Sequence, residues 1–152
     1  VRDRGQHGIV EEAEGRQGEA WYRGPVIVNW DDALRGARGD DSGANLVLHE
    51  FAHQLDMEDR SIDGTPPLSG RAAYERWHAV MPREFERLRQ DAKARRATLL
   101  DKYGATDPGE FFSVATECFF QRPRALRDRH ADLYEELRAY YRQHPAAWNV
   151  GM

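Results

Sequence analysis

Two short apolar runs near the start of the chain have a pattern that predicts β-strands. Residues 20–22 and 25–30 are rich in β-branched and aromatic side chains, and Arg23-Gly24 separates them as a turn. The glycine- and charge-rich residues 1–18 predict a loop or a ragged edge, and residues 31–43 predict a short helical turn followed by another loop. We therefore expect a small β-sheet ahead of the main body of the chain.

From Asn45 onward the apolar positions predict helices. Asn45 suits an N-cap, and the mostly apolar run from there to Met57 predicts a buried helix. Glycines and prolines make residues 58–70 a loop. We expect a helix over 71–80 and, because proline interrupts helices, a second one that starts at Pro82 and reaches about residue 97.

The last third of the chain predicts further helices. Asp107 suits an N-cap with Pro108 at the first helical position, and that helix reaches about Phe120. Pro123 and Pro145 bracket the final helical stretch, which is most regular over 131–143. The pattern predicts an α+β class, mainly helical with a small β-sheet. A length of 152 residues suits one domain over the whole chain, 1–152.

Composition narrows the classes of partner and compartment. A formal net charge of −4 and the absence of a basic stripe argue against nucleic acid. No apolar run is long enough to span a bilayer, and the first 15 residues lack a signal-peptide core. Cys118 is the only cysteine, so no disulfide can form within the chain. We expect a cytoplasmic protein without a membrane or nucleic-acid partner, and a fragment or processed chain because the first residue is not Met.

His49-Glu50-Phe51-Ala52-His53 is the motif that carries chemistry. Histidines four residues apart lie one helical turn apart on one face, where both can bind one zinc ion. Glu50 lies beside the metal and can take a proton from water held there. The alternative is a pair of core histidines whose hydrogen bonds are satisfied elsewhere. Burying two histidines and a glutamate on one apolar helix without a common purpose is costly, so we favour the metal site.

The sequence leaves the remaining metal contacts open. A third histidine six residues after His53 would indicate another peptidase class, but Asp59 stands there. A carboxylate from a second helix is the usual alternative, and Glu110 and Glu117 share a helix face. Glu110 could instead form a capping box, and Glu117 could be a paired buried group or a polar surface residue. Asp56 could accept a hydrogen bond from a ligating histidine or face water at the helix end.

Several segments together resemble the Mlc titration factor A (MtfA) family of bacterial zinc peptidases. The resemblance covers the chain from about residue 18 onward. It rests on Gly24-Pro25-Val26-Ile27-Val28-Asn29-Trp30-Asp31-Asp32, Asn45 to Asp56, Gly64-Thr65-Pro66-Pro67-Leu68, Tyr103 to Phe112, Leu133-Tyr134 and Tyr140-Tyr141-Arg142-Gln143.

The resemblance implies a zincin-like fold and a cytosolic zinc peptidase with aminopeptidase-type activity on small peptides. It implies His49, His53 and Glu110 as ligands of one Zn²⁺ ion and Glu50 as the base. It also implies a tyrosine near the metal at Tyr103, which could donate a hydrogen bond to the oxyanion; the alternative is an aromatic that packs at a helix entrance.

The chain also departs from the family. It is shorter than family members, and we expect an N-terminal segment of the family to be missing. Cys118 stands where we expect an aromatic residue, which concerns packing.

A rival interpretation is a binding module that sequesters a transcriptional regulator, with peptidase activity incidental. A purely structural zinc site usually contains several cysteines, and the single Cys118 argues against one. For the enzyme, the expected partner is a peptide substrate that lies along the strand near 25–30 through backbone hydrogen bonds.

Overall fold

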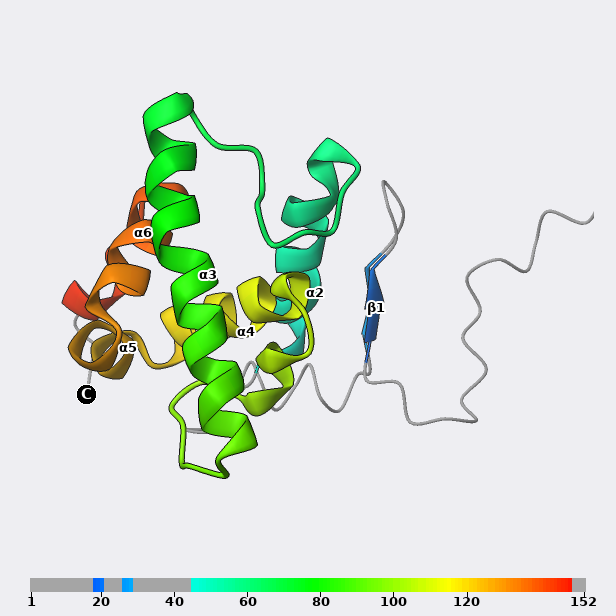
Figure 1. Cartoon of the computed structure of the whole chain (residues 1–152). Helices are drawn as coiled ribbons and strands as arrows, with labels where there is room; N and C mark the ends of the chain where they lie inside the picture. Colours follow the sequence, from blue (N-terminus) through cyan, green and yellow to red (C-terminus); the bar gives the residue numbers. More distant parts are fainter. Residues whose placement is uncertain (1–17, 21–25, 29–44, 149–152) are drawn as a thin grey trace, which may run out of the picture.

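A computed structural model describes residues 18–20, 26–28 and 45–148. Figure 1 shows helices packed together, with a short strand beside them. The longer elements are β1 (Gly18–Ala20), β2 (Val26–Val28), α2 (Leu46–Asp56), α3 (Arg71–Lys93), α4 (Pro108–Gln121), α5 (Pro123–Arg129) and α6 (Ala131–Tyr141). Three short 3-10 turns are η2 (Met57–Asp59), η3 (Lys102–Ala105) and η4 (Pro145–Ala147).

The predicted α+β class is wrong, because the described fold is helical. Its β structure is confined to β1 and β2, two three-residue strands that pair antiparallel with Gly18 opposite Val28. A ladder of this length is a short ribbon and does not form a layer of the core. Of the loop predicted over 1–18, only Gly18 is described, and it lies in β1. The turn predicted at Arg23-Gly24 and the segment 31–43 lie outside the described residues, as do Trp21, Tyr22, Pro25, Asn29 and Trp30 of the predicted strands.

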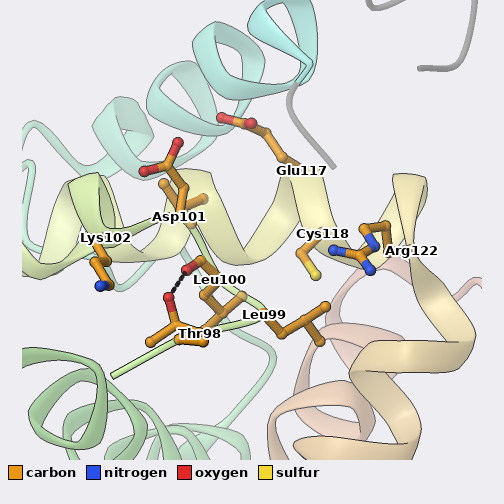
Figure 2. Close-up of a pocket in the computed structure, with 10 residues that line it drawn as sticks. Thr98, Leu99, Leu100, Asp101, Lys102, Glu117, Cys118 and Arg122 are labelled. Atoms are coloured by element: carbon orange, nitrogen blue, oxygen red, sulfur yellow. Dashed lines mark hydrogen bonds between the residues drawn. The ribbon is translucent and has the colours of Figure 1, made fainter. Parts of the chain in front are cut away.

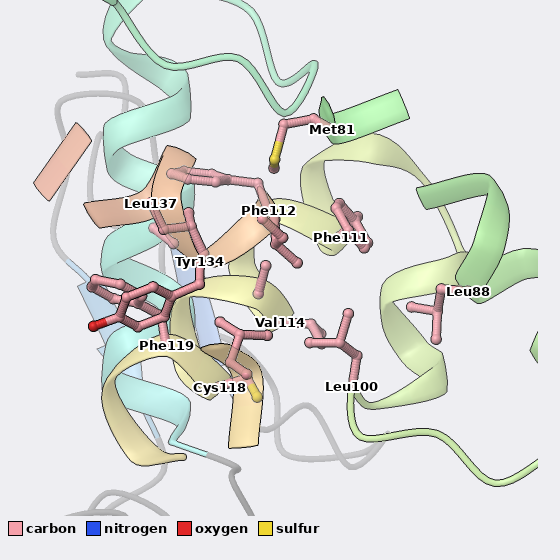
Figure 3. Close-up of a cluster of buried hydrophobic side chains, with 14 of the residues drawn as sticks. Met81, Leu88, Leu100, Phe111, Phe112, Val114, Cys118, Phe119, Tyr134 and Leu137 are labelled. Atoms are coloured by element: carbon pink, nitrogen blue, oxygen red, sulfur yellow. The ribbon is translucent and has the colours of Figure 1, made fainter. Parts of the chain in front are cut away.

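Helix α4 is the centre of the described core. It lies between α2 on one side and α5 and α6 on the other, with α3 across it (Figure 1). Every residue from Phe111 to Phe119 is buried, which explains why this segment is apolar almost all round. Figure 3 shows side chains from α3, α4 and α6 meeting around it, among them Met81, Phe112, Val114, Phe119, Tyr134 and Leu137.

The starts of α2 and α4 lie where the sequence predicts them. The Asn45 side chain accepts a hydrogen bond from the Leu48 N–H at 3.1 Å, and Asp107 accepts one from the Glu110 N–H at 2.9 Å. Both are N-caps, which satisfy amides that have no partner within the helix. Pro108 occupies the first turn of α4, as predicted. The two caps fix the first residues of α2 and α4. They therefore also fix the positions of His49 and Glu110, which lie close to those starts.

The predicted helix break before Pro82 is wrong. Helix α3 runs unbroken from Arg71 to Lys93 with Pro82 inside it. Trp77 and Met81 before the proline and Leu88 after it are buried on one face. Burial of one continuous apolar stripe offsets the hydrogen bond that proline cannot donate.

The final helical stretch is divided. It consists of α5 and α6, separated at His130. Within the described residues, no helix combines the length and apolar character needed to cross a bilayer.

Candidate metal centre

Three side chains from two helices meet at one point. His49 and His53 lie one turn apart on α2, and Glu110 lies in the first turn of α4. One donor atom from each falls within 4.8 Å of the other two. Because α2 packs against α4, residues 57 to 61 positions apart in sequence become neighbours. The structure thus brings together the three residues that the family resemblance implied as ligands.

The mutual distances of the donor atoms suit a tetrahedral metal. The His49 Nε2 and His53 Nε2 atoms are 3.2 Å apart. Glu110 Oε2 lies 2.9 Å from His49 Nε2 and 3.3 Å from His53 Nε2. Two ligand atoms held about 2.0–2.1 Å from a tetrahedral zinc would be about 3.3 Å apart. The donor set is one that zinc prefers, and it leaves a fourth position for water or substrate.

The outer nitrogens of both histidines have partners that orient the rings. His49 Nδ1 donates to the Glu117 carboxylate, and the other oxygen of that carboxylate accepts the Asn45 N–H at 3.0 Å. His53 Nδ1 lies 3.2 Å from the Ser113 hydroxyl oxygen. Binding each ring through Nδ1 leaves its Nε2 facing the shared point, as in known metal sites. Ser113 was not predicted, because a serine within an apolar helix carries no distinguishing pattern.

The two glutamates of α4 occupy different places. Glu110 has its carboxylate at the inner nitrogens of both histidines, whereas Glu117 lies behind His49 at its outer nitrogen. Glu110 makes one of the two hydrogen bonds of a capping box, because its backbone N–H donates to the Asp107 side chain. Its carboxylate does not bond back to the N-cap amide and contacts the histidines instead. Glu117 is buried and paired, which was one of the two alternatives left open by the sequence.

The charges at this cluster are strongly coupled. Burial of His49 disfavours its protonated form, but hydrogen bonds to Glu110 and Glu117 outweigh burial and raise its pKa to about 10. Burial likewise opposes ionisation of Glu110, but hydrogen bonds to His49 and His53 lower its pKa to about 2. These shifts favour a protonated His49 between the carboxylates of Glu110 and Glu117. This is the electrostatic environment that a divalent metal ion would also satisfy.

Glu50 and Tyr103 lie beside the cluster. Glu50 follows His49 on α2 and is buried. The ring of Tyr103, on η3, has its centroid 6.2 Å from that of His49 and is 56% exposed, so Tyr103 is not a core packing residue. The negative charge of Glu110 raises the pKa of the Tyr103 phenol, with smaller contributions from burial, Asp107 and Glu50. The phenol therefore stays protonated at neutral pH, within the field of both glutamates.

Both predicted roles of Asp56 are wrong. The side chain is fully buried and so does not face water. Its Oδ2 atom accepts the Gly64 N–H at 2.9 Å, while the outer nitrogens of His49 and His53 bind Glu117 and Ser113 instead. Asp56 thus binds the loop that follows α2.

Glu117 also lines a pocket of about 460 Å³. Figure 2 shows residues that line it: Glu117 and Cys118 of α4, Arg122 just after that helix, and the segment from Thr98 to Lys102. Burial raises the pKa of the Cys118 thiol to about 12, so the thiol stays protonated at neutral pH. Cys118 lines this pocket and belongs to the buried core, and it is not one of the three clustered side chains.

Comparison with known proteins gives one family match. Residues 2–142 match the family model described as glucose-regulated metallo-peptidase M90. The matched segment includes α2, α4 and the three clustered side chains.

Curated relatives agree with that match. The chain is 40% identical over 134 residues to an uncharacterised protein of Synechocystis, covering 88% of this chain and 49% of the relative. It is 38% identical over 136 residues to a Mlc titration factor A of Serratia proteamaculans, covering 87% and 50%. It is 37% identical over 145 residues to that of Yersinia enterocolitica, covering 92% and 53%. The chain thus spans about half the length of the curated relatives it matches.

Proposed function

We propose that this chain, which belongs to the glucose-regulated metallo-peptidase M90 family, holds one zinc ion at His49, His53 and Glu110 and hydrolyses peptide bonds there. The observation that carries the proposal is the set of donor distances of 2.9, 3.2 and 3.3 Å among these three side chains. Zinc would polarise the scissile carbonyl and lower the pKa of water toward neutrality.

Glu50 is the general base of the proposed reaction. It follows His49 directly on α2, is buried, and is not one of the three clustered side chains, which suits a base beside the proposed ligands. From that position it takes the proton from the attacking water and delivers it to the leaving amine. The two acidic residues thus have different proposed roles: Glu110 is a metal ligand, and Glu50 is the general base that transfers the proton.

Tyr103 is the proposed oxyanion donor. Its phenol keeps its proton at neutral pH because Glu110 raises its pKa, and it sits at the exposed side of the cluster. A donor there can stabilise the negative charge that develops on the carbonyl oxygen. We further propose aminopeptidase-type activity on small peptides, which rests on the family resemblance of the motifs around His49 and Glu110.

A second candidate is a regulatory binding module. The relatives named Mlc titration factor A favour it, since their name describes titration of another protein. In that case a protein partner would bind the chain whether or not Glu50 can act as a base.

The test combines zinc analysis with cleavage of a peptide library by wild type, Glu50→Gln and Glu110→Ala. Glu50→Gln should keep its zinc and lose about 10²-fold or more of its activity, the usual scale for a positioned acid–base group. Glu110→Ala should lose zinc and activity together. Glu75→Gln, which changes an exposed carboxylate on α3, is the matched control and should behave as wild type.

Two outcomes would contradict the proposal. Wild-type turnover by zinc-loaded Glu50→Gln would remove Glu50 as the base, and normal zinc affinity in Glu110→Ala would remove Glu110 as a ligand. A wild type that holds zinc but cleaves no peptide would favour the binding module.

A further inference from the structure

Asp56 is a buried carboxylate that the proposed chemistry does not use. It is the last residue of α2, three positions after His53, and its side chain is fully buried. The Oδ2 atom accepts the Gly64 N–H, and within the described residues the buried Oδ1 atom has no hydrogen-bond partner. Burying a carboxylate costs free energy unless hydrogen bonds or an opposite charge offset the loss of water. The burial of Asp56 therefore needs an explanation.

Gly64 is held against the start of α4. Its φ of +77° is a conformation that side chains other than glycine rarely adopt. A Cβ atom on Gly64 would lie 2.4 Å from the backbone oxygen of Pro108, the first residue of α4. The other side of Gly64 is fixed too, because Trp77 donates its indole N–H to the Gly64 carbonyl at 3.1 Å. Gly64 is thus locked between Asp56, Trp77 and Pro108.

Asp56 itself reaches the same turn of α4. A Cβ atom on Gly109 would lie 3.5 Å from Asp56 Oδ2 and 2.8 Å from the Ile62 side chain. Glu110 is the next residue along. The negative carboxylate also lies where the positive end of the α4 dipole favours it. The end of α2 and the first turn of α4 therefore meet through Asp56 and Gly64.

We infer that Asp56 is a positioning residue of the metal centre, which sets the place of Glu110 by tying the end of α2 through Gly64 to the first turn of α4. His49 and His53 lie on α2, and Glu110 lies on α4. The distances between the proposed ligand atoms therefore depend on the position of α4 along α2, here called their register. The hydrogen bond from Gly64 to Asp56 and the close approach of Gly64 to Pro108 fix that register on the side nearest Glu110. This inference rests on the proposed role of Glu110 as a ligand.

The first experiment measures zinc affinity by competition with a chelator in Asp56→Ala and Asp56→Asn. Asp56→Ala removes the acceptor of the Gly64 N–H and should weaken zinc binding about 10-fold or more, the scale for groups that support ligands. Asp56→Asn keeps an acceptor oxygen and should remain closer to wild type than Asp56→Ala. The visible absorption of the Co²⁺-loaded proteins reports ligand geometry separately from affinity, and it should change in Asp56→Ala.

A destabilised control separates positioning from loss of stability. Leu126→Ala removes a fully buried side chain of α5, a helix that carries no proposed ligand and takes no part in the junction of Asp56, Gly64 and Pro108. It should lower the melting temperature yet leave zinc affinity and the Co²⁺ spectrum unchanged. Wild-type zinc affinity and spectrum in folded Asp56→Ala would overturn the inference, as would an equal loss of affinity in Leu126→Ala.

Two glycines with positive φ give a second, independent test. Gly64 and Gly70 both have positive φ, +77° and +90°, but a Cβ on Gly70 would meet nothing within 4 Å. Gly64→Ala should therefore weaken zinc binding by displacing the start of α4, whereas Gly70→Ala should bind zinc as wild type does. Equal zinc affinities for the two variants would overturn the inference, and this holds even if Asp56→Ala fails to fold.

The two proposals fail in different ways. If Glu110→Ala binds zinc normally, the proposed ligand set fails and the role of Asp56 fails with it. If Glu110→Ala loses zinc while Asp56→Ala and Gly64→Ala both keep it, the ligand set stands and only the positioning role is lost.

Discussion

At the scale of single residues, Glu117 joins two features that the sequence presents separately. One of its oxygens accepts from His49 Nδ1 and the other from the backbone N–H of Asn45, the N-cap of α2. The same carboxylate therefore orients the proposed ligand His49 and accepts the backbone N–H of Asn45 at the start of α2. Its removal should disturb both at once.

Glu117→Ala tests that double role. We expect zinc affinity to fall about 10- to 100-fold, because His49 loses the group that orients it and makes it a better ligand. The metal-free variant should also unfold at a lower temperature, since the Asn45 N–H loses its partner. Chelator competition and thermal unfolding measure the two effects. A variant that loses stability but binds zinc as wild type does would show that Glu117 serves only the helix.

Tyr103→Phe isolates one hydroxyl. The substitution keeps the aromatic ring beside His49 and removes only its hydroxyl group. Because Tyr103 is exposed, the fold and the bound zinc should be unchanged. We expect kcat to fall about 10²-fold with little change in KM, because the lost hydrogen bond forms only as charge develops on the oxyanion. Steady-state kinetics on the zinc-loaded variant decide the matter. An unchanged kcat would leave Tyr103 without a catalytic role.

At the scale of elements, the junction of α2, the following loop and α4 has its own pH dependence. Burial raises the pKa of Asp56 to about 6, and the Gly64 N–H opposes this rise. The charges of Asp63 and Asp59 add to the rise, whereas the backbone N–H of Asp63 opposes it. Because the folded-state pKa lies above the unfolded value of about 3.9, the unfolded chain releases this proton first as pH rises. The stability contributed by Asp56 is therefore fully present below the unfolded pKa of about 3.9 and is lost as pH rises through the folded-state pKa of about 6.

Denaturant unfolding of the metal-free proteins checks this sign. Asp56→Asn cannot titrate, so the free energy of unfolding of wild type minus that of the variant should decrease between pH 4 and pH 7. The other titrating groups are common to both proteins and cancel in the difference, apart from those in contact with Asp56. A difference that stays constant or grows with pH would contradict the raised pKa.

Local signals in the sequence predict some elements well and others poorly. The caps at Asn45 and Asp107 are local, since each depends on an amide three residues away, and both are confirmed. The break at Pro82 was wrong because burial on both sides of the proline overrides its local preference. The α+β class was wrong for a related reason: an apolar alternating segment predicts strands but not whether they form a layer of the core.

In the candidate site, too, features set by local spacing could be predicted from the sequence, whereas features set by the packing of distant helices could not. The histidine pair is local to one helix turn, so its spacing alone indicates the chemistry. The different positions of Glu110 and Glu117 depend on how α4 docks on α2, about 60 residues away in sequence, and periodicity could not separate them. The contact of Asp56 with Gly64, and through it with Pro108, is likewise tertiary and leaves no periodic pattern.

At the scale of the whole molecule, the proposed metal would link α2 directly to α4. A ligand that binds the folded state but not the unfolded state stabilises the fold by about 2.7 kcal/mol when its free concentration is 100 times its Kd. We therefore expect zinc to raise the melting temperature and a chelator to lower it reversibly. Glu110→Ala should show a much smaller zinc-dependent shift, and Glu75→Gln a shift like that of wild type. A melting temperature independent of zinc would contradict binding at this centre.

The order of the ligands along the chain has a consequence for synthesis. His49 and His53 leave the ribosome together, whereas Glu110 follows 57 residues after His53. A nascent chain that ends before α4 can offer a metal ion only the two imidazoles, and Glu117 has not yet been made to orient His49. In the proposed site, selective capture of the ion has to wait until α4 emerges and docks, so a nascent chain that ends before α4 would lack the proposed peptidase activity.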